Sequence, residues 1–173
     1  MQANKIIWFT GLSGSGKTTL ANGLESYLKN KEVTVKIIDG DAIRENNKIN
    51  SFDKVDIINN NERIIELCKK LQMEYDYLLV TVIAPFNQTR QKARRIFAKN
   101  YIEVYLKANL EIVIKRDTKG LYEKALAGKL NNMIGLDPIV PYEEPDRSEI
   151  VINTGYEKPE ESLNRLIKLL DLV

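Results

Sequence analysis

The chain has 173 residues and a mass of 19.8 kDa, which is the size of a single domain. It contains no histidine and one cysteine, Cys68, which excludes a Ser-His-Asp triad, histidine-based metal sites, an intrachain disulfide and a cysteine-cluster metal site. The 26 basic and 24 acidic residues give a net charge of +2, which offers no argument for nucleic acid. No apolar run reaches membrane-spanning length. We therefore expect one cytoplasmic domain over residues 1–173, with neither a membrane nor nucleic acid as a partner.

The predicted elements alternate between strands and helices, which favours an α/β fold with a mostly parallel sheet. Continuous apolar runs predict strands buried on both faces, whereas apolar residues spaced three and four apart predict helices. In chain order we expect a strand at 5–10, a helix at 18–31, a strand at 33–38, a helix at 59–75, a strand at 77–84, a helix at 88–100, a strand at 102–106, a helix from 110, a strand at 149–152 and a helix from 159.

The segment at 117–147 differs from the rest, because it is rich in Gly, Asn and Pro and has weak periodicity. In a compact domain, a segment of this kind often forms a mobile lid. No repeat or linker divides the chain. We therefore predict one doubly wound domain that carries a lid.

A phosphate-binding motif stands between the first predicted strand and the first predicted helix. Residues 11–18 read GLSGSGKT and fit G-x-x-x-x-G-K-[ST] in full, in the strand–loop–helix context that this P-loop motif requires. Its glycines let backbone N–H groups converge on phosphates, and the helix N-terminus adds its positive end. We expect Lys17 to bridge the β- and γ-phosphates of ATP and Thr18 to hold Mg²⁺. The predicted nucleotide-binding residues of the loop are Gly11, Ser13, Gly14, Ser15, Gly16, Lys17, Thr18 and Thr19.

The position of the acidic residues separates the classes of P-loop protein. A GTPase needs Asn-Lys-x-Asp for guanine, and residues 47–50 fail that pattern at its last position. Motor-type ATPases usually carry an acid at the end of the strand beside the P-loop strand, but the 77–84 strand ends in Ala-Pro. Here Asp39 and Asp41 follow the 33–38 strand, where a hydroxyl-bearing substrate enters small-molecule kinases. A solvated Asp-Gly-Asp turn is the alternative.

Further motifs resemble those of the adenylylsulfate kinase family. The P-loop region, residues 11–21, closely resembles that of the family, and residues 39–44 (DGDAIR) resemble its D-G-D-N-I-R. Residues 83–90 resemble I-S-P-[YF]-x-x-x-R, and residues 116–122 (RDTKGLY) resemble R-D-P-K-G-L-Y, which is far more specific than a P-loop. Residues 135–145 resemble G-I-D followed by P-Y-E-x-P. The resemblance thus covers most of the chain.

This resemblance implies a reaction and a set of roles. The family moves the γ-phosphoryl group of ATP, with Mg²⁺, to the ribose 3′-hydroxyl of a nucleotide whose 5′-phosphate carries a further group. Asp41 is then the general base or a magnesium ligand, Lys17 acts on the phosphates, and Arg116 and Lys119 belong to a lid that closes over ATP and excludes water. The acceptor-binding residues that the resemblance implies are Asp39, Arg44, Phe52, Asn60, Ile83, Ala84, Pro85, Arg90, Lys119, Gly120, Leu121 and Met133.

Several positions depart from the family's acceptor motifs. Ile57 stands where the family has an arginine that contacts the acceptor, and Glu62 replaces a second arginine. Of two phenylalanines that sandwich the acceptor's adenine in the family, Phe52 is kept and Met133 stands at the other position. Isoleucine cannot replace a bidentate donor, and the loss of one aromatic face weakens base stacking. The departures favour an acceptor nucleotide with a less anionic 5′ end. With them, the sequence resembles one branch of the family, cytidine diphosphoramidate kinase, which serves the O-methyl phosphoramidate decoration of bacterial capsules.

Two alternatives stay open. In the first, the chain is a true adenylylsulfate kinase and its departures are tolerated drift. In the second, it is a nucleotide-binding module without transfer activity, which the presence of Lys17, Thr18, Asp41, Arg44 and Lys119 disfavours. Members of the family commonly form dimers, so a homodimer is compatible with the resemblance, although no residue pattern specifies an interface.

Overall fold

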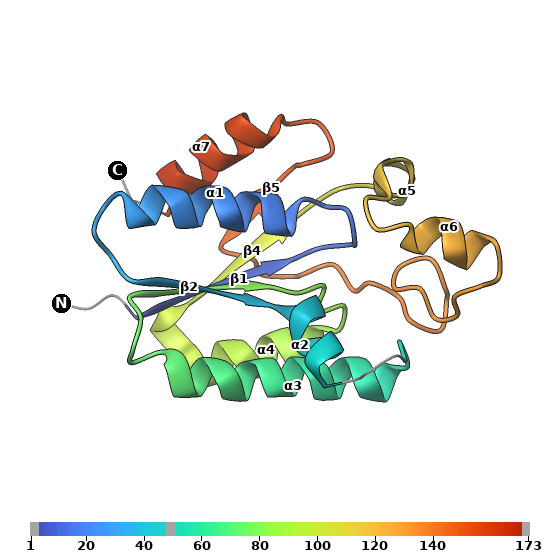
Figure 1. Ribbon diagram of the computed structural model, residues 1–173, viewed down its shortest axis with the longest axis horizontal. Coiled ribbons are helices and arrows are strands. Elements are labelled where there is room, and N and C mark those ends of the chain that lie inside the picture. Colours follow the sequence, from blue (N-terminus) through green and yellow to red (C-terminus); the bar gives the residue numbers. More distant parts are fainter. Residues whose placement is uncertain (1–3, 48–50, 171–173) are drawn as a thin grey trace.

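The computed structural model describes residues 4–47 and 51–170. Of the residues 47–50 that were compared with the guanine-binding motif of GTPases, residues 48–50 therefore lie outside the described residues. Five parallel strands form one sheet in the order β2-β3-β1-β4-β5 (Figure 1). The predicted α/β class and the parallel sheet are therefore confirmed. The strands are β1 (Lys5–Thr10), β2 (Val35–Asp39), β3 (Tyr77–Thr81), β4 (Tyr101–Leu106) and β5 (Ile150–Ile152).

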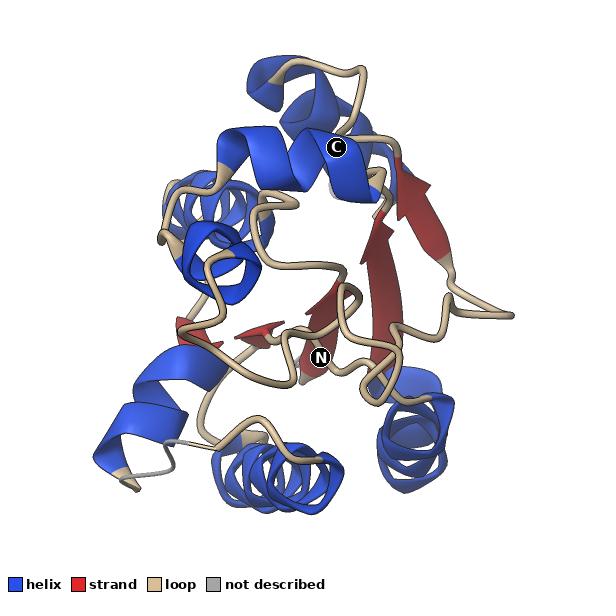
Figure 2. Ribbon diagram, turned by 90° about the vertical axis from the view of Figure 1, so that its right-hand side faces the viewer, coloured by secondary structure: helices blue, strands red, loops and turns tan. Residues whose placement is uncertain are grey.

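Helices cover both faces of this sheet, as the edge-on view shows (Figure 2). One face carries α1 (Lys17–Lys29) and α7 (Pro159–Leu169), and the other carries α3 (Lys54–Leu71) and α4 (Asn87–Phe97). Beyond one end of the sheet lie the short helices α5 and α6 (Figure 1). The shorter elements are α2 (Gly40–Asn46), a 3₁₀ turn at Ala98–Asn100, α5 (Leu110–Arg116) and α6 (Leu121–Leu126).

The central strand β1 explains the two-sided core. Ile6 and Trp8 pack in the cluster beneath α3 and α4, whereas Ile7 and Phe9 pack in the cluster beneath α1 and α7. All four side chains are fully buried. A strand that is covered by helices on both faces has no face exposed to solvent, which is why its sequence is a continuous apolar run.

Several predicted boundaries were wrong, and two of them have a clear local cause. The helix expected at 59–75 begins at Lys54, because Ile57 already joins its buried face. The strand expected at 77–84 ends at Thr81, because Ala84 has a positive φ of 45° and the next residue is proline. The alternative of a solvated Asp-Gly-Asp turn is not what the structure shows, because Asp39 ends β2 and caps α2, which begins at Gly40.

Candidate active site

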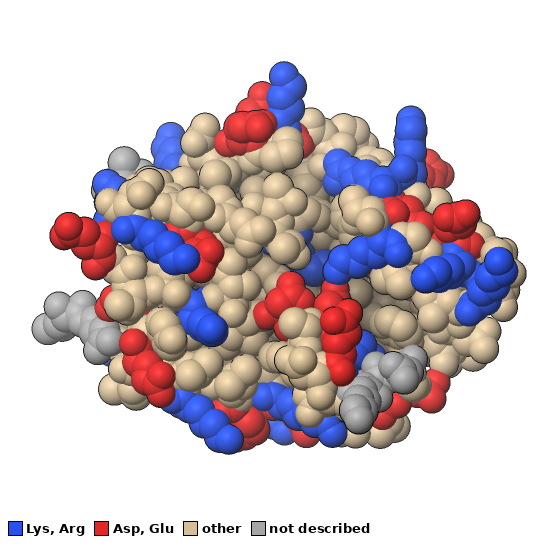
Figure 3. Space-filling view, viewed as in Figure 1, with Lys and Arg blue, Asp and Glu red and all other residues tan. Residues whose placement is uncertain are grey.

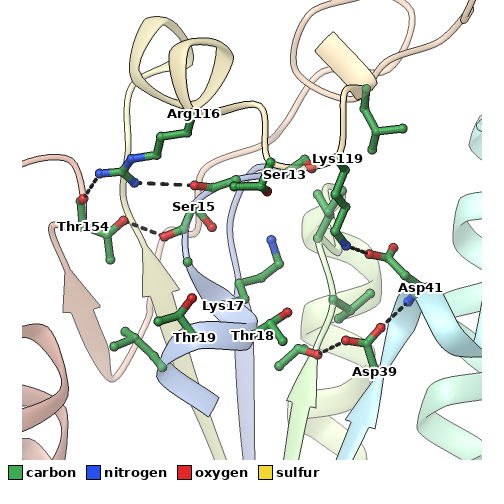
Figure 4. A pocket seen from close by; sticks show the side chains of 18 of the residues that line it. Ser13, Ser15, Lys17, Thr18, Thr19, Asp39, Asp41, Arg116, Lys119 and Thr154 are labelled. Carbon is green, nitrogen blue, oxygen red and sulfur yellow. Dashed lines mark hydrogen bonds and ion pairs between the residues drawn. The ribbon is translucent and has the colours of Figure 1, made fainter. Parts of the chain in front are cut away.

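The predicted site residues gather where parallel strands end, the usual place for a ligand in an α/β sheet. The P-loop follows β1, Asp39 ends β2, and residues 82–85 follow β3. Together they border a cavity of about 480 Å³, part of which Figure 4 shows. The predicted residues that line it are Ser13, Gly14, Ser15, Gly16, Lys17, Thr18, Thr19, Asp39, Asp41, Phe52, Ile83, Arg116, Lys119, Leu121 and Met133.

The P-loop forms a tight cradle that its glycines permit. Gly11 has φ +146°, and a Cβ there would lie 2.6 Å from the Leu106 carbonyl oxygen at the end of β4. Gly14 and Gly16 also have positive φ, and Gly16 leads directly into α1. The Ser15 hydroxyl is buried and has no hydrogen-bond partner among the described residues. Such a cradle at a helix N-terminus fits the phosphates of a nucleotide.

Lys17 lies at the floor of the cradle. Its ammonium donates to the carbonyl oxygens of Gly11 and Leu12, each at 2.8 Å. Burial lowers the pKa of Lys17 to about 8, with the charge of Lys119 acting in the same direction and that of Asp41 opposing it. An ammonium that has lost most of its water gains strongly from a phosphate, so this position suits the β- and γ-phosphates.

Asp39 and Asp41 have different parts in the structure. One Asp39 oxygen caps α2 by accepting from the backbone N–H groups of Asp41 and Ala42, at 2.9 and 3.1 Å. The other accepts from the Thr81 hydroxyl at 3.0 Å. Asp39 is therefore a residue that holds the start of α2 in place. The Asp41 carboxylate projects into the cavity, opposite Lys17 (Figure 4).

The Asp41 carboxylate is paired with Lys119, which approaches from the segment before α6 (Figure 4). Burial alone would lower the pKa of Lys119, but the hydrogen bond and charge of Asp41 raise it above its ordinary value. Both side chains keep about half of their surface exposed, at 48% and 55%. A pair this exposed contributes little stability, so a ligand can replace it at small cost.

The loop between β5 and α7 supplies a wall that the sequence analysis missed. The Thr154 hydroxyl donates to the Ser15 carbonyl oxygen at 2.8 Å. Arg116 in turn donates to the Thr154 carbonyl oxygen at 2.6 Å (Figure 4). No motif marks these positions, because small residues at a strand end resemble any loop. Lining residues that were not predicted are Leu20, Thr81, Val82, Thr118, Ile134, Thr154, Glu157, Pro159 and Ser162.

A second, smaller cavity of about 20 Å³ lies beside Asp41. Its lining contains four predicted residues that the main cavity lacks: Arg44, Asn60, Ala84 and Pro85. The Arg44 guanidinium lies over the Phe52 ring, 4.7 Å from its centroid. A cation and an aromatic face thus stand together at the acceptor end of the site.

Two of the departures from the family motifs are apolar packing positions. Ile57 is 1% exposed and packs in a cluster with Phe86, Ile134 and Val140, against which Phe52 also lies. Met133 lines the main cavity but packs with a different cluster, around Tyr122. Of the neighbouring residues Met133 and Ile134, it is therefore Ile134 that packs in the same cluster as Phe52.

Three predicted residues do not line either cavity. Gly11 contributes its carbonyl oxygen to Lys17, and Gly120 is the left-handed residue before α6, with φ +63°. Arg90 is 2% exposed and points into the protein, where it donates to the carbonyl oxygens of Ala84 and Glu143 and to the Asn87 side chain. Arg90 therefore holds the loop after β3 and does not reach the cavity.

The comparisons with known proteins agree with this geometry. The adenylylsulphate kinase family matches residues 3–153 of the chain. This chain belongs to that family. The adenylyl-sulfate kinase of Clostridium kluyveri is 39% identical over 166 residues, which are 95% of this chain and 82% of that protein. The enzyme of Prochlorococcus marinus is 41% identical over 171 residues, covering 96% of this chain and 84% of that protein.

A solved member of the family superposes on most of the structure. The Mycobacterium tuberculosis APS kinase CysC, in complex with AMPPNP and APS, has a TM-score of 0.88 and 32% identity. The match covers 96% of this chain and 97% of that one. As a member of the adenylylsulphate kinase family, the chain is an ATP-dependent kinase that phosphorylates a hydroxyl group.

Proposed function

We propose that this chain transfers the γ-phosphoryl group of ATP to the ribose 3′-hydroxyl of a nucleoside 5′-phosphoanhydride, with adenylyl sulfate as the first acceptor to test. The observation that carries the proposal is the position of Asp41, between the P-loop cradle and the cavity that Arg44 and Phe52 border. The relatives' names supply adenylyl sulfate, and the tuberculosis enzyme was solved with both an ATP analogue and APS.

ATP with Mg²⁺ fits the donor side. The phosphates fit the cradle of residues 11–17, whose Ser15 hydroxyl is buried and without a partner among the described residues. Thr18 and Asp41 both line the cavity and can serve as oxygen ligands of a magnesium ion that keeps water and phosphate as its other ligands. The ion neutralises charge on the phosphates.

In the proposed reaction the 3′-oxygen of the acceptor attacks the γ-phosphorus of ATP, and ADP leaves with the β–γ bridging oxygen. Asp41 accepts the proton of the hydroxyl, and Lys17 balances the charge that builds on the phosphate oxygens. Arg44 and Asn60 lie where the acceptor's phosphate end is expected. Arg116 and Lys119, from the segment that we propose as the lid, complete the donor side.

The remaining expectations stay proposals. We place the whole chain in one domain with a lid at about 117–147, because the strands form a single sheet and the site lies where its strands end. A kinase that consumes ATP is expected in the cytoplasm. No helix among the described residues is long and apolar enough to cross a membrane. A homodimer remains a prediction from the family resemblance.

The test is turnover with ATP and Mg²⁺, with adenylyl sulfate and cytidine diphosphoramidate offered in parallel to the wild-type chain. The proposal expects an acceptor-dependent release of ADP and a nucleotide product that carries one more phosphate. ADP release that neither acceptor changes would contradict the proposal, because it would indicate simple ATP hydrolysis.

Cytidine diphosphoramidate is the second candidate, and the packing of Ile57 favours it. This side chain places an apolar wall where the family has an acceptor-binding arginine, which leaves Arg44 as the cation that borders the smaller cavity. We expect the double variant Ile57→Arg with Met133→Phe to raise kcat/KM for adenylyl sulfate. If the double variant gains nothing with that acceptor, these two positions do not set the specificity.

A further inference from the structure

A side-chain hydrogen bond joins the proposed lid to the start of α3. The Asn132 side-chain nitrogen donates to the Asp53 carboxylate, and the two residues are 79 positions apart in the chain. Asp53 is the N-cap of α3, where an aspartate usually accepts from the first N–H groups of its own helix. Among the described residues its side chain makes no such cap bond, so the carboxylate is available to Asn132.

The backbone around Asn132 is held in place on the lid side. Asn132 has φ +59°, in the left-handed region that few residues other than glycine and asparagine adopt. The next residue, Met133, is 2% exposed and packs in a cluster with Tyr122 and Val113. The amide that reaches α3 therefore stands on an anchored stretch of the lid.

The two bonded residues are the direct neighbours of Phe52 and Met133, which both line the main cavity. Phe52 and Met133 pack in different clusters. On the buried side, Ile134 packs in the cluster of Phe52 and links the two segments. On the exposed side, the link is the hydrogen bond between Asn132 and Asp53. This bond therefore helps to set the distance between Phe52 and Met133.

The segment that carries Phe52 is also held from α2. The Arg44 guanidinium donates to the Ser51 carbonyl oxygen at 2.6 Å and lies over the Phe52 ring. The Ser51 hydroxyl accepts from the Asp53 backbone N–H at 3.0 Å. Phe52 is thus fixed on the α2 side, and the loss of the lid bond would release only the side of the cavity that carries Met133.

We propose that Asp53 and Asn132 are positioning residues for the acceptor, whose base lies between Phe52 and Met133. Their hydrogen bond holds the lid side of this slot at the distance that stacking on the base requires. The bond itself is exposed to water, so its contribution is to acceptor binding and hardly to the stability of the fold. This inference rests on the proposed 3′-kinase function.

The first experiment removes the bond and keeps the backbone. Asn132→Gly retains a residue that readily adopts a positive φ but has no side chain to donate. With ATP, Mg²⁺ and the better of adenylyl sulfate and cytidine diphosphoramidate, we expect KM for the acceptor to rise about fivefold, while kcat and KM for ATP stay within about twofold. The matched control is Asn131→Gly, an exposed neighbour outside the cavity lining, which should change neither KM.

The second experiment exchanges the two partners. Asn132→Asp sets two carboxylates against each other, and we expect KM for the acceptor to rise about tenfold or more, with a smaller rise at high salt. The double variant Asp53→Asn with Asn132→Asp restores one donor and one acceptor in the reverse order. Its KM for the acceptor should return to within about twofold of wild type.

Three outcomes would overturn the inference and leave the kinase activity standing. They are an acceptor KM that Asn132→Gly leaves unchanged, a double variant that does not recover, and equal rises in the KM values for acceptor and ATP, which indicate a general structural role. If wild type phosphorylates neither acceptor, the proposed function fails, and this inference fails with it. Melting temperatures should stay close to wild type in every variant, because the bond is exposed.

Discussion

Asp41 is the residue on which the proposed chemistry depends. Its backbone N–H is fixed by Asp39, and its carboxylate is held by an exposed pair with Lys119 that substrates can displace. The Asp41 carboxylate is therefore in position before the substrates bind, but its pair with Lys119 contributes little to the stability of the fold.

Replacing Asp41 by alanine should therefore abolish transfer without abolishing ATP binding. We expect kcat to fall by about 10²–10⁴-fold, the usual contribution of a general base, with little change in the dissociation constant of ATP. Turnover assays and calorimetric titration with ATP measure the two effects. The control is Glu45→Gln, an exposed carboxylate on the same helix. Turnover close to wild type in Asp41→Ala would remove this residue from the mechanism.

The lowered pKa of Lys17 predicts that ATP binding depends on pH. Because burial lowers its pKa to about 8 in the free protein, about half of the ammonium groups have lost their proton at that pH, and more lose it as the pH rises. Bound phosphate favours the charged form and raises the pKa again, so ATP binding takes up a proton near pH 8 to 9 and KM for ATP rises with pH in that range. Calorimetry in buffers of different ionisation enthalpy measures the uptake. In Lys17→Arg the rise should disappear, because arginine stays charged; the same rise in that variant would assign the titration elsewhere.

At the scale of elements, the loop after β3 is held in place by the lid's far end. Arg90 of α4 donates to the Glu143 carbonyl oxygen at 2.6 Å, and the Glu143 carboxylate accepts from the Asn87 backbone N–H, also at 2.6 Å. The Glu143 backbone N–H donates to the Pro85 carbonyl oxygen at 2.8 Å. The residues that border the smaller cavity are thus positioned by a buried arginine that does not touch it.

Replacing Arg90 by methionine should weaken acceptor recognition more than ATP binding. The buried carbonyl groups that Arg90 pairs would be left without donors, which should cost about 2–4 kcal/mol of unfolding free energy. We expect KM for the acceptor to rise about tenfold while KM for ATP stays within about twofold. Arg95→Met, an exposed position on the same helix, is the control. Equal rises in both KM values would indicate a general structural defect instead of a positioning role.

Sequence reasoning located the elements that have strong periodicity and the residues that stand in motifs. It identified the strand at Lys5–Thr10 with its observed bounds, and the P-loop lies where the motif places it. It could not find Thr154 or Glu157, because these come to the site only through the packing of β5 beside β4. Nor could it show that Arg90 points inward, because Arg90 stands with Lys92, Arg94 and Arg95 in one basic stretch, and the sequence does not show which of these side chains is buried.

At the scale of the whole molecule, the proposed lid is attached to the rest of the protein at several points. In its middle, the Tyr122 hydroxyl donates to the Ser13 carbonyl oxygen at 3.1 Å, and Met133, Ile134 and Val140 are buried in clusters with residues outside the segment. Its early part is tied to α2 by the exposed Lys119–Asp41 pair. Its far end is held at Glu143, and just after the lid the Glu149 carboxylate accepts from the Glu103 backbone N–H at 2.8 Å. On the face in Figure 3, acidic and basic side chains are interspersed over this region and the rest of the molecule. Opening should therefore concern the mostly exposed residues 123–131, which lie between the buried Tyr122 and Met133.

Limited proteolysis tests this motion. Lys124 and Lys129 are exposed within the proposed lid, and trypsin should cleave there in the free protein. A non-hydrolysable ATP analogue with Mg²⁺ and an acceptor should slow cleavage at both sites by about tenfold, because closure buries the segment. Lys29 and Lys31 are exposed at the end of α1 that is distant from the P-loop. Cleavage after these two residues should not change and serves as the internal control. Equal cleavage of the lid with and without ligands would contradict the closure.

The position of the transferred phosphate tests the central claim most directly. Phosphorus NMR of the product, formed from ATP, Mg²⁺ and the better of the two acceptors, distinguishes a phosphate on the ribose 3′-oxygen from one added at the 5′ end. The account predicts a new phosphomonoester on the 3′-oxygen, with the 5′-phosphoanhydride intact. A product extended at its 5′ end, or inorganic phosphate alone, would contradict it.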